Sequence, residues 1–202
     1  MQSDLPLSRR AFGVVFTGGL VIAALPRAAF ALTVDEAKSL IDKAVADVNQ
    51  IISSGASESA MLPKFEQVFV RYADVPTIAR SALGVAARSA SDAQMAAFTK
   101  SYQGYISRKY GRRFREFIGG KIKVNDARAI KSYFEVISTA TLQGEAPFDL
   151  RWQVSDKSGK NLFFNIIIEG VNMLASERTE IGALLDQRGG DLDKLIADLK
   201  GL

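Results

Sequence analysis

The hydrophobic positions of the first half of the chain recur every three to four residues, a spacing that predicts amphipathic helices. Thr33 and Glu36 form a capping-box pattern, so we expect the first helix to begin there and to end before Gly55. A second helix is predicted over residues 61–72. A short third helix is predicted from Asp74, which can act as its N-cap, to the glycine at position 84.

A long fourth helix is predicted to open at Ser91 with another capping pattern. Its apolar face is an aromatic stripe made by Met95, Phe98, Tyr102, Tyr105, Ile106 and Tyr110. Its polar side ends in a basic cluster made by Arg108, Lys109, Arg112, Arg113 and Arg115. We interpret the basic cluster as a solvated face, with an acidic partner surface or an anionic headgroup as the alternative.

After Gly119 and Gly120 the hydrophobic period changes to two, which predicts strands. Strands are expected at residues 121–125, 133–142, 148–155 and 162–169, with a hairpin turn at 156–159. Two short helices, at about 175–187 and 191–199, complete the chain. Helices, then an antiparallel sheet of about four strands, then helices define an α+β fold class.

The fourth predicted strand is apolar on both faces. One face carries Leu162, Phe164, Ile166 and Ile168, and the other carries Phe163, Asn165, Ile167 and Glu169. A half-exposed strand alternates between apolar and polar residues, so we expect this strand to lie in the middle of the sheet. The other helices would cover one face of the sheet, and the C-terminal helices would cover part of the second.

Residues 1–31 have the pattern of a cleavable export signal. A basic start with Arg9 and Arg10 precedes an apolar run that is shorter than the roughly 20 residues of a membrane span. The paired arginines resemble a twin-arginine signal, although Gly13 and Val14 depart from that pattern and leave the export route open. Residues 32–202 would then form a single domain.

Charge and composition exclude several kinds of chemistry. The net charge of +4 falls by two when the first 31 residues are removed, which gives no reason to expect a nucleic-acid partner. The chain has no cysteine and no histidine. It therefore lacks disulfides, Ser-His and Cys-His nucleophile systems, and the ligands that zinc sites use most.

Two stretches are more specific than a general α+β domain. The first runs Phe65-x-x-x-Phe69-x-x-Tyr72-Ala-Asp74 and continues to Tyr110, and the second is Ile166-x-Ile168-Glu169-Gly170-Val171 followed by Arg178-x-Glu180. Together they resemble the toluene-tolerance family, the MlaC-type periplasmic phospholipid-binding proteins, over about residues 39–200. Asn165, Asn172 and Ile181 depart from the residues usual in that family.

The resemblance implies a soluble carrier in the periplasm that binds a phospholipid by its acyl chains. The implied partners are an outer-membrane lipoprotein–porin complex and an inner-membrane ABC transporter complex with its substrate-binding ring. Such shuttling helps to maintain outer-membrane lipid asymmetry. The resemblance implies no enzyme activity, no catalytic residue, no metal and no cofactor.

An apolar pocket between a curved sheet and the helices is what a lipid carrier requires, because acyl chains need a dry and largely apolar cavity. The residues predicted to line it are Phe69, Tyr72, Ile78, Leu83, Phe98, Tyr102, Tyr105, Tyr110, Phe134, Val136, Trp152, Val154, Phe164, Ile166 and Ile168. Ordinary core packing is the competing interpretation of the same side chains. Asp74 and Arg80 are expected to be structural, as a helix cap and an internal ion pair.

Three other functions remain open at this stage. A relative associated with hopanoid lipids would carry a rigid polycyclic guest in the same pocket. A cone-shaped α+β enzyme would need a base in the pocket, and the predicted inward strand faces offer no Asp, Glu or His. An envelope adaptor that binds only proteins would have a filled core instead of a cavity.

Overall fold

The computed structural model of the chain describes residues 32–113 and 119–202. The predicted export signal at residues 1–31 and one member of the basic cluster, Arg115, lie outside the described residues. The division of the chain at position 31 therefore stays a prediction.

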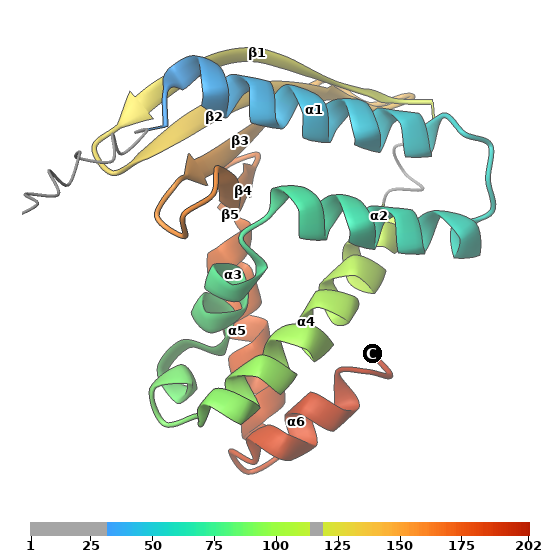
Figure 1. The fold of residues 1–202 in the computed structure, drawn as a ribbon. Coiled ribbons are helices and arrows are strands. Elements are labelled where there is room, and N and C mark those ends of the chain that lie inside the picture. Colours follow the sequence, from blue (N-terminus) through green and yellow to red (C-terminus); the bar gives the residue numbers. More distant parts are fainter. Residues whose placement is uncertain (1–31, 114–118) are drawn as a thin grey trace, which may run out of the picture. The chain divides into compact units, whose positions relative to one another are not determined.

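The helices begin and end close to the predicted positions (Figure 1). Thr33 Oγ1 accepts a hydrogen bond from Glu36 N at 3.2 Å, and Glu36 Oε2 accepts one from Thr33 N at 2.8 Å, which confirms the capping box. Ser91 and Gln94 make the same reciprocal pair at the start of the fourth helix. The helices are α1 (Val34–Ile52), α2 (Glu58–Tyr72), α3 (Val75–Leu83), η1 (Gly84–Arg88, a 3₁₀ helix), α4 (Asp92–Arg113), α5 (Met173–Asp186) and α6 (Leu192–Asp198).

The strands form one open antiparallel sheet in the order β1-β2-β3-β4-β5, which confirms the α+β class. They are β1 (Lys121–Ile130), β2 (Tyr133–Thr141), β3 (Phe148–Ser155), β4 (Leu162–Ile168) and β5 (Val171–Asn172). β1 extends beyond the predicted end at residue 125, because a bulge there interrupts the alternation of side chains while the pairing continues. β5 was missed because two residues carry no periodicity.

β4 contains a bulge that changes the face of one aromatic residue. Val154 pairs with Phe163 and Gln153 pairs with Asn165, so Phe164 is an extra residue between the two pairs. Phe163 therefore points to the same face as Trp152, and the two rings meet edge to face at 5.3 Å. The predicted assignment of Phe163 and Asn165 to one face was wrong.

β4 is not in the middle of the sheet, contrary to the prediction. It pairs with β3 along its length, but β5 covers only Ile167 and Ile168. Near its start, Asp74 N donates to Phe163 O at 2.8 Å in an isolated bridge. The doubly apolar character of β4 instead reflects a strand that borders a cavity on one face.

The helices pack on one face of the sheet. α1 lies along β1, β2 and β3, while α3 and α5 contact β4 (Figure 1). The opposite face carries the partly exposed or exposed residues Ile137, Thr139, Asp149, Arg151 and Ile167. The prediction that C-terminal helices cover this second face was therefore wrong. Within the described residues, no helix is long and apolar enough to cross a membrane.

Candidate functional site

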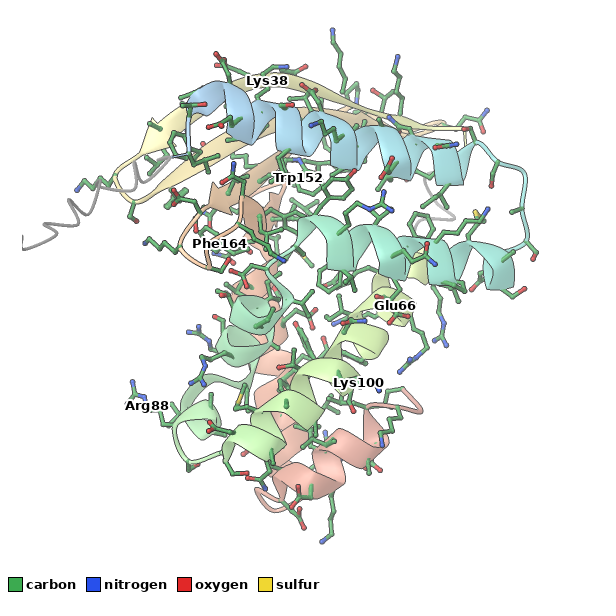
Figure 2. The ribbon with its side chains drawn as sticks, in the orientation of Figure 1. Lys38, Glu66, Arg88, Lys100, Trp152 and Phe164 are labelled. Carbon is green, nitrogen blue, oxygen red and sulfur yellow. The ribbon has the colours of Figure 1, made fainter. Side chains whose placement is uncertain are left out.

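A cavity of about 540 Å³ lies between the sheet and the helices. Its wall is mostly apolar and comes from α1, α2, α3, α4 and α5, together with the inner face of β3 and β4. The cavity is partly open to solvent. Trp152 and Phe164, labelled in Figure 2, both belong to the wall. Trp152 is held in place by a hydrogen bond from its Nε1 to Ser138 Oγ at 3.1 Å.

The cavity brings together eight of the fifteen residues predicted to contact lipid. They come from α2, α3, α4, β3 and β4, and are Phe69, Ile78, Tyr102, Tyr110, Trp152, Phe164, Ile166 and Ile168. Residues from distant parts of the sequence therefore meet at one surface. Whether they bind lipid stays a prediction.

The other seven predicted residues do not line the cavity: Tyr72, Leu83, Phe98, Tyr105, Phe134, Val136 and Val154. They pack against protein atoms instead. Phe98 stacks on Tyr102 with ring centroids 5.5 Å apart, and the Tyr72 hydroxyl donates to Asp47 Oδ2 at 2.8 Å. Periodicity identifies the inward face of an element, but it does not distinguish the part that meets a cavity from the part that meets other side chains.

Several lining residues were missed by the sequence analysis. α1 contributes Ala44 and Val48, and the start of α5 contributes Met173, Leu174 and Glu177. In α5, Glu177 lies three positions after Leu174 and four after Met173, so the three share a helix face, which was the available signal. A glutamate on that face gave no reason to expect burial, so the face was not predicted to line a pocket.

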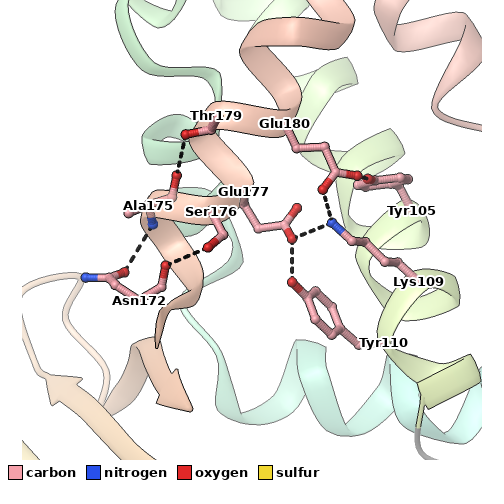
Figure 3. Close-up of polar contacts among 9 residues, drawn as sticks. All are labelled: Tyr105, Lys109, Tyr110, Asn172, Ala175, Ser176, Glu177, Thr179 and Glu180. Atoms are coloured by element: carbon pink, nitrogen blue, oxygen red, sulfur yellow. Dashed lines mark hydrogen bonds and ion pairs between the residues drawn. The ribbon is translucent and has the colours of Figure 1, made fainter. Parts of the chain in front are cut away.

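A polar network joins α4 to α5 at the cavity wall (Figure 3). Lys109 Nζ lies 2.7 Å from Glu177 Oε1 and also contacts Glu180 Oε2. The hydroxyl of Tyr110 donates to Glu177, and that of Tyr105 donates to Glu180. Lys109 was predicted to lie on a solvated basic face, but it is mostly buried and paired within the chain.

A second member of the basic cluster is also engaged within the fold. Arg108 donates from its Nη2 to the carbonyl oxygen of Leu199 at 2.6 Å, just after α6. Arg112 remains exposed. The basic cluster is therefore partly a set of helix-to-helix contacts, and the interpretation as a solvated face was wrong for Arg108 and Lys109.

Glu177 is the buried carboxylate of this network, with an exposed fraction of 3%. Its Oε1 accepts from both Lys109 and Tyr110. Within the described part of the chain, its Oε2 is buried without a hydrogen-bond partner, as is the hydroxyl of Tyr102. Burial raises the pKa of Tyr102, and the negative charge of Glu177 raises this pKa further. Tyr102 therefore stays a neutral phenol, and two polar groups in the cavity wall have unmet hydrogen-bonding capacity.

Asn165 connects the sheet to α5 at the edge of the cavity. Its Oδ1 accepts from Leu174 N at 3.0 Å, and its Nδ2 donates to Gln153 Oε1 and Asn172 Oδ1. Asn172 in turn caps α5 by accepting from Ala175 N at 3.1 Å. These two departures from the family pattern therefore act together, because an aspartate at 165 has no hydrogen to donate to Asn172.

Asp74 and Arg80 are structural, but they do not act as a pair. Asp74 caps α3 by accepting from Thr77 N at 3.1 Å, which confirms the predicted cap. Arg80 donates to the carbonyl oxygen of Ala87 at 3.5 Å rather than to Asp74. Among residues 32–113 and 119–202, no cluster of three or more acidic side chains has the arrangement of a metal site.

The fold and the cavity place the chain in the class of α+β proteins that enclose an apolar pocket between an open antiparallel sheet and helices. A solved structure with the same fold is a phospholipid-binding protein from Ralstonia solanacearum in complex with a phospholipid. The TM-score is 0.66 at 22% sequence identity, and the match covers 81% of this chain and 98% of that one. The chain belongs to the MlaC protein family, which it matches over residues 38–201.

Proposed function

We propose that this chain is a carrier that binds a phospholipid by its acyl chains and moves it between membranes. The observation that supports the proposal most directly is the cavity of about 540 Å³, whose wall is mostly apolar. Membership of the MlaC family supports it independently. The structural relative from Ralstonia solanacearum, which holds a phospholipid, is consistent with the same use of the fold.

The energetics of lipid transfer explain why such a cavity is needed. Each methylene that leaves water gains roughly 0.8 kcal/mol, so two acyl chains oppose passage through water by an amount on the order of 20 kcal/mol. A protein lowers this barrier by surrounding the chains with apolar side chains. Trp152, Phe164 and Ile166 supply such a surface on one side, and helical residues such as Phe69 supply the other.

We place the carrier in the periplasm after removal of residues 1–31. There it would exchange phospholipid with an outer-membrane lipoprotein–porin complex and with an inner-membrane ABC transporter complex that has a substrate-binding ring. These partners and this location rest on the family and on the pattern of the first 31 residues. Maintenance of outer-membrane lipid asymmetry is the role that follows.

The cavity opposes some of the competing functions and is compatible with others. A protein-only adaptor predicts a filled core, which the cavity opposes. A small-molecule enzyme needs an available base, and α5, a helix that the expectation about the inward strand faces did not cover, places Glu177 in the wall. However, one oxygen of Glu177 is occupied by Lys109 and Tyr110, and its other oxygen is buried, which argues against a role as a catalytic base. A hopanoid-type guest fits the same wall.

The proposal is tested by extracting the purified full chain and identifying co-purified lipid by mass spectrometry. We expect phospholipid in about a one-to-one ratio to protein, because acyl chains buried in the cavity dissociate slowly into water. A polycyclic lipid in place of phospholipid would favour the hopanoid alternative. An extract without lipid, combined with no uptake from phosphatidylethanolamine vesicles, would contradict the proposal.

Trp152 provides a direct reading of occupancy, since it is the only tryptophan in the sequence and lies in the cavity wall. Delipidated protein mixed with brominated phosphatidylcholine vesicles should lose Trp152 fluorescence, because bromine atoms on an acyl chain would contact the indole ring. Unbrominated vesicles are the matched control. Equal emission with the two lipids would exclude acyl chains from this part of the cavity.

A further inference from the structure

The cavity wall contains a polar pair that the carriage of plain acyl chains does not use. Glu177 Oε2 and the hydroxyl of Tyr102 are buried and have no hydrogen-bond partner among residues 32–113 and 119–202, although both residues line the cavity. A buried polar group without a partner is destabilising, because it has lost its hydrogen bonds to water. An all-hydrocarbon guest leaves that destabilisation in place for both groups.

The network around Glu177 determines what a guest can offer to it. Lys109 Nζ and the Tyr110 hydroxyl both donate to Oε1, so Glu177 is a carboxylate ion-paired with Lys109, and its Oε2 is left over. A charged carboxylate oxygen only accepts hydrogen bonds. The complementary group on a guest must therefore donate a hydrogen.

Tyr102 adds a second requirement for the polar group of the guest. Its neutral phenol donates one hydrogen bond and also accepts, and its side chain lines the same cavity wall as Glu177. An ester carbonyl of a phospholipid would satisfy Tyr102 alone, because it has no hydrogen for Glu177. A hydroxyl group satisfies both residues, since it donates to one and accepts from the other.

We propose that Glu177 and Tyr102 form a subsite for an aliphatic hydroxyl group carried on the buried part of a lipid, either on an acyl chain or on a polycyclic skeleton. This inference rests on the proposed function and specifies its cargo further. Neither oxygen is exposed in the empty cavity, so the lining side chains must part slightly to admit the group. An ammonium group is a worse match, because its charge would have to be desolvated beside Lys109.

The test compares small probes whose oxygen carries either a hydrogen or a methyl group. Binding to the delipidated full chain is followed by Trp152 fluorescence. The chain-type pair is 1-decanol and decyl methyl ether, and the polycyclic pair is 1-adamantanol and 1-methoxyadamantane. We expect the alcohol to bind at least about five-fold more tightly than its ether in one pair or both, and that pair identifies the skeleton. Equal affinities in both pairs, or tighter binding of decylamine than of decanol, would overturn the subsite.

Failure of the subsite is distinguishable from failure of the proposed function. If no probe and no acyl chain binds, the cavity does not hold an apolar guest and the carrier proposal fails. If both members of each pair bind equally well, the carrier proposal stands and only the hydroxyl subsite fails.

Glu177→Gln gives a sharper outcome than simple loss. Lys109 and Tyr110 keep the amide oxygen on their side, so the amide nitrogen replaces Oε2 toward the cavity and donates instead of accepting. The preference should then reverse in favour of the ether. Glu180→Gln is the matched control, because Glu180 belongs to the same network without lining the cavity, and its preference should equal that of the unaltered chain.

Tyr102→Phe keeps the test valid if the glutamine variant folds poorly. This change should weaken both members of a pair by a similar factor, about five-fold, while the preference for the alcohol remains. Circular dichroism confirms that each variant is folded before it is titrated. An unreversed preference in a folded Glu177→Gln variant would overturn the assignment of Glu177.

Discussion

Gly84 has a backbone conformation that other residues rarely adopt. It ends α3 with φ 62° and ψ −127°, and a Cβ atom at this position would lie 3.4 Å from Cγ of Arg178. Arg178 in turn donates to the carbonyl and the hydroxyl oxygen of Ser81. Gly84 thus allows α3 to end where the arginine of α5 crosses it.

Gly84→Ala should lower the free energy of unfolding by about 1–3 kcal/mol, because an L-residue is strained at this φ and ψ. The measurement is urea unfolding followed by circular dichroism. Gly182→Ala is the control within a regular helix, where no atom lies within 4 Å of the added Cβ. That change should raise stability by about 1 kcal/mol. Equal effects of the two changes would show that the conformation of Gly84 is not strained for alanine.

At the scale of the strand, the bulge in β4 determines which side chains reach the cavity. Ile166 pairs with Trp152 and lines the wall, whereas Ile167 pairs with Arg151 on the opposite face. Adjacent isoleucines thus have different surroundings. Substituting Ile166 and Ile167 in turn therefore separates the effect of a charge in the cavity wall from the general effect of a charge in β4.

Ile166→Asp should reduce the amount of co-purified lipid about ten-fold, because a carboxylate in the wall must be desolvated when acyl chains enter. Ile167→Asp should leave lipid content unchanged, since the new carboxylate lies beside Arg151. Lipid is measured per mole of folded protein by mass spectrometry. Equal loading of both variants would remove Ile166 from the lipid-binding surface.

The contact of α4 with α5 depends on a buried ion pair. Lys109→Met should destabilise the fold by about 3 kcal/mol, because Glu177 would be left as a buried charge with a weaker set of donors. Lys100→Met, an exposed position on the same helix, should change stability by less than about 0.5 kcal/mol.

The ion-pair interpretation has a second requirement. Combining Lys109→Met with Glu177→Gln should recover most of the lost stability, because the uncompensated charge is removed as well. Thermal unfolding of the single and double variants measures this coupling. A double variant as unstable as Lys109→Met would contradict the account.

The sequence predicted the helices better than the strands because helix ends are marked locally. Two helix starts were predicted to within one residue from capping pairs, Thr33 with Glu36 and Ser91 with Gln94. The end of β1 and the face of Phe163 were mispredicted, because each depends on a bulge that only the partner strand reveals. The two-residue β5 is defined entirely by its pairing with β4.

At the scale of the whole molecule, buried tyrosines should make the free energy of unfolding decrease at alkaline pH. Burial raises the pKa of Tyr102 and of Tyr105, in the latter case helped by the hydrogen bond to Glu180. The unfolded chain ionises near pH 10, while the folded chain resists ionisation. The stability that these groups contribute is therefore fully present below pH 10 and declines as the pH rises above it.

Between pH 9 and pH 11, the free energy of unfolding should fall more steeply for the unaltered chain than for Tyr102→Phe, by about 1 kcal/mol. Urea unfolding at each pH gives the difference. The comparison with the variant cancels the contribution of lysines, which titrate in the same range. Parallel pH profiles would show that Tyr102 ionises normally in the folded chain.

The cavity was predictable in its general position but not in its full composition. Aromatic and branched residues on the inward faces of α4, β3 and β4 correctly indicated the space between them, through residues such as Tyr102 and Trp152. The contribution of α5 was not predictable from apolar periodicity, because its decisive residue is a glutamate. Its burial depends on Lys109, a residue 68 positions away in the sequence.

Among the described strands, β1 has a neighbour on one side only, and the groups along its other edge affect how two copies of the chain can meet. The Asn49 side chain accepts from the backbone nitrogen of Ile122 and donates to its carbonyl oxygen, so that part of the edge is already occupied. Lys121 and Lys123 project on either side of it, and the bulge at Asn125 follows. Edge-to-edge stacking into fibrils would have to displace the asparagine and bring lysines together, which protects a crowded solution of this protein from aggregation along that strand.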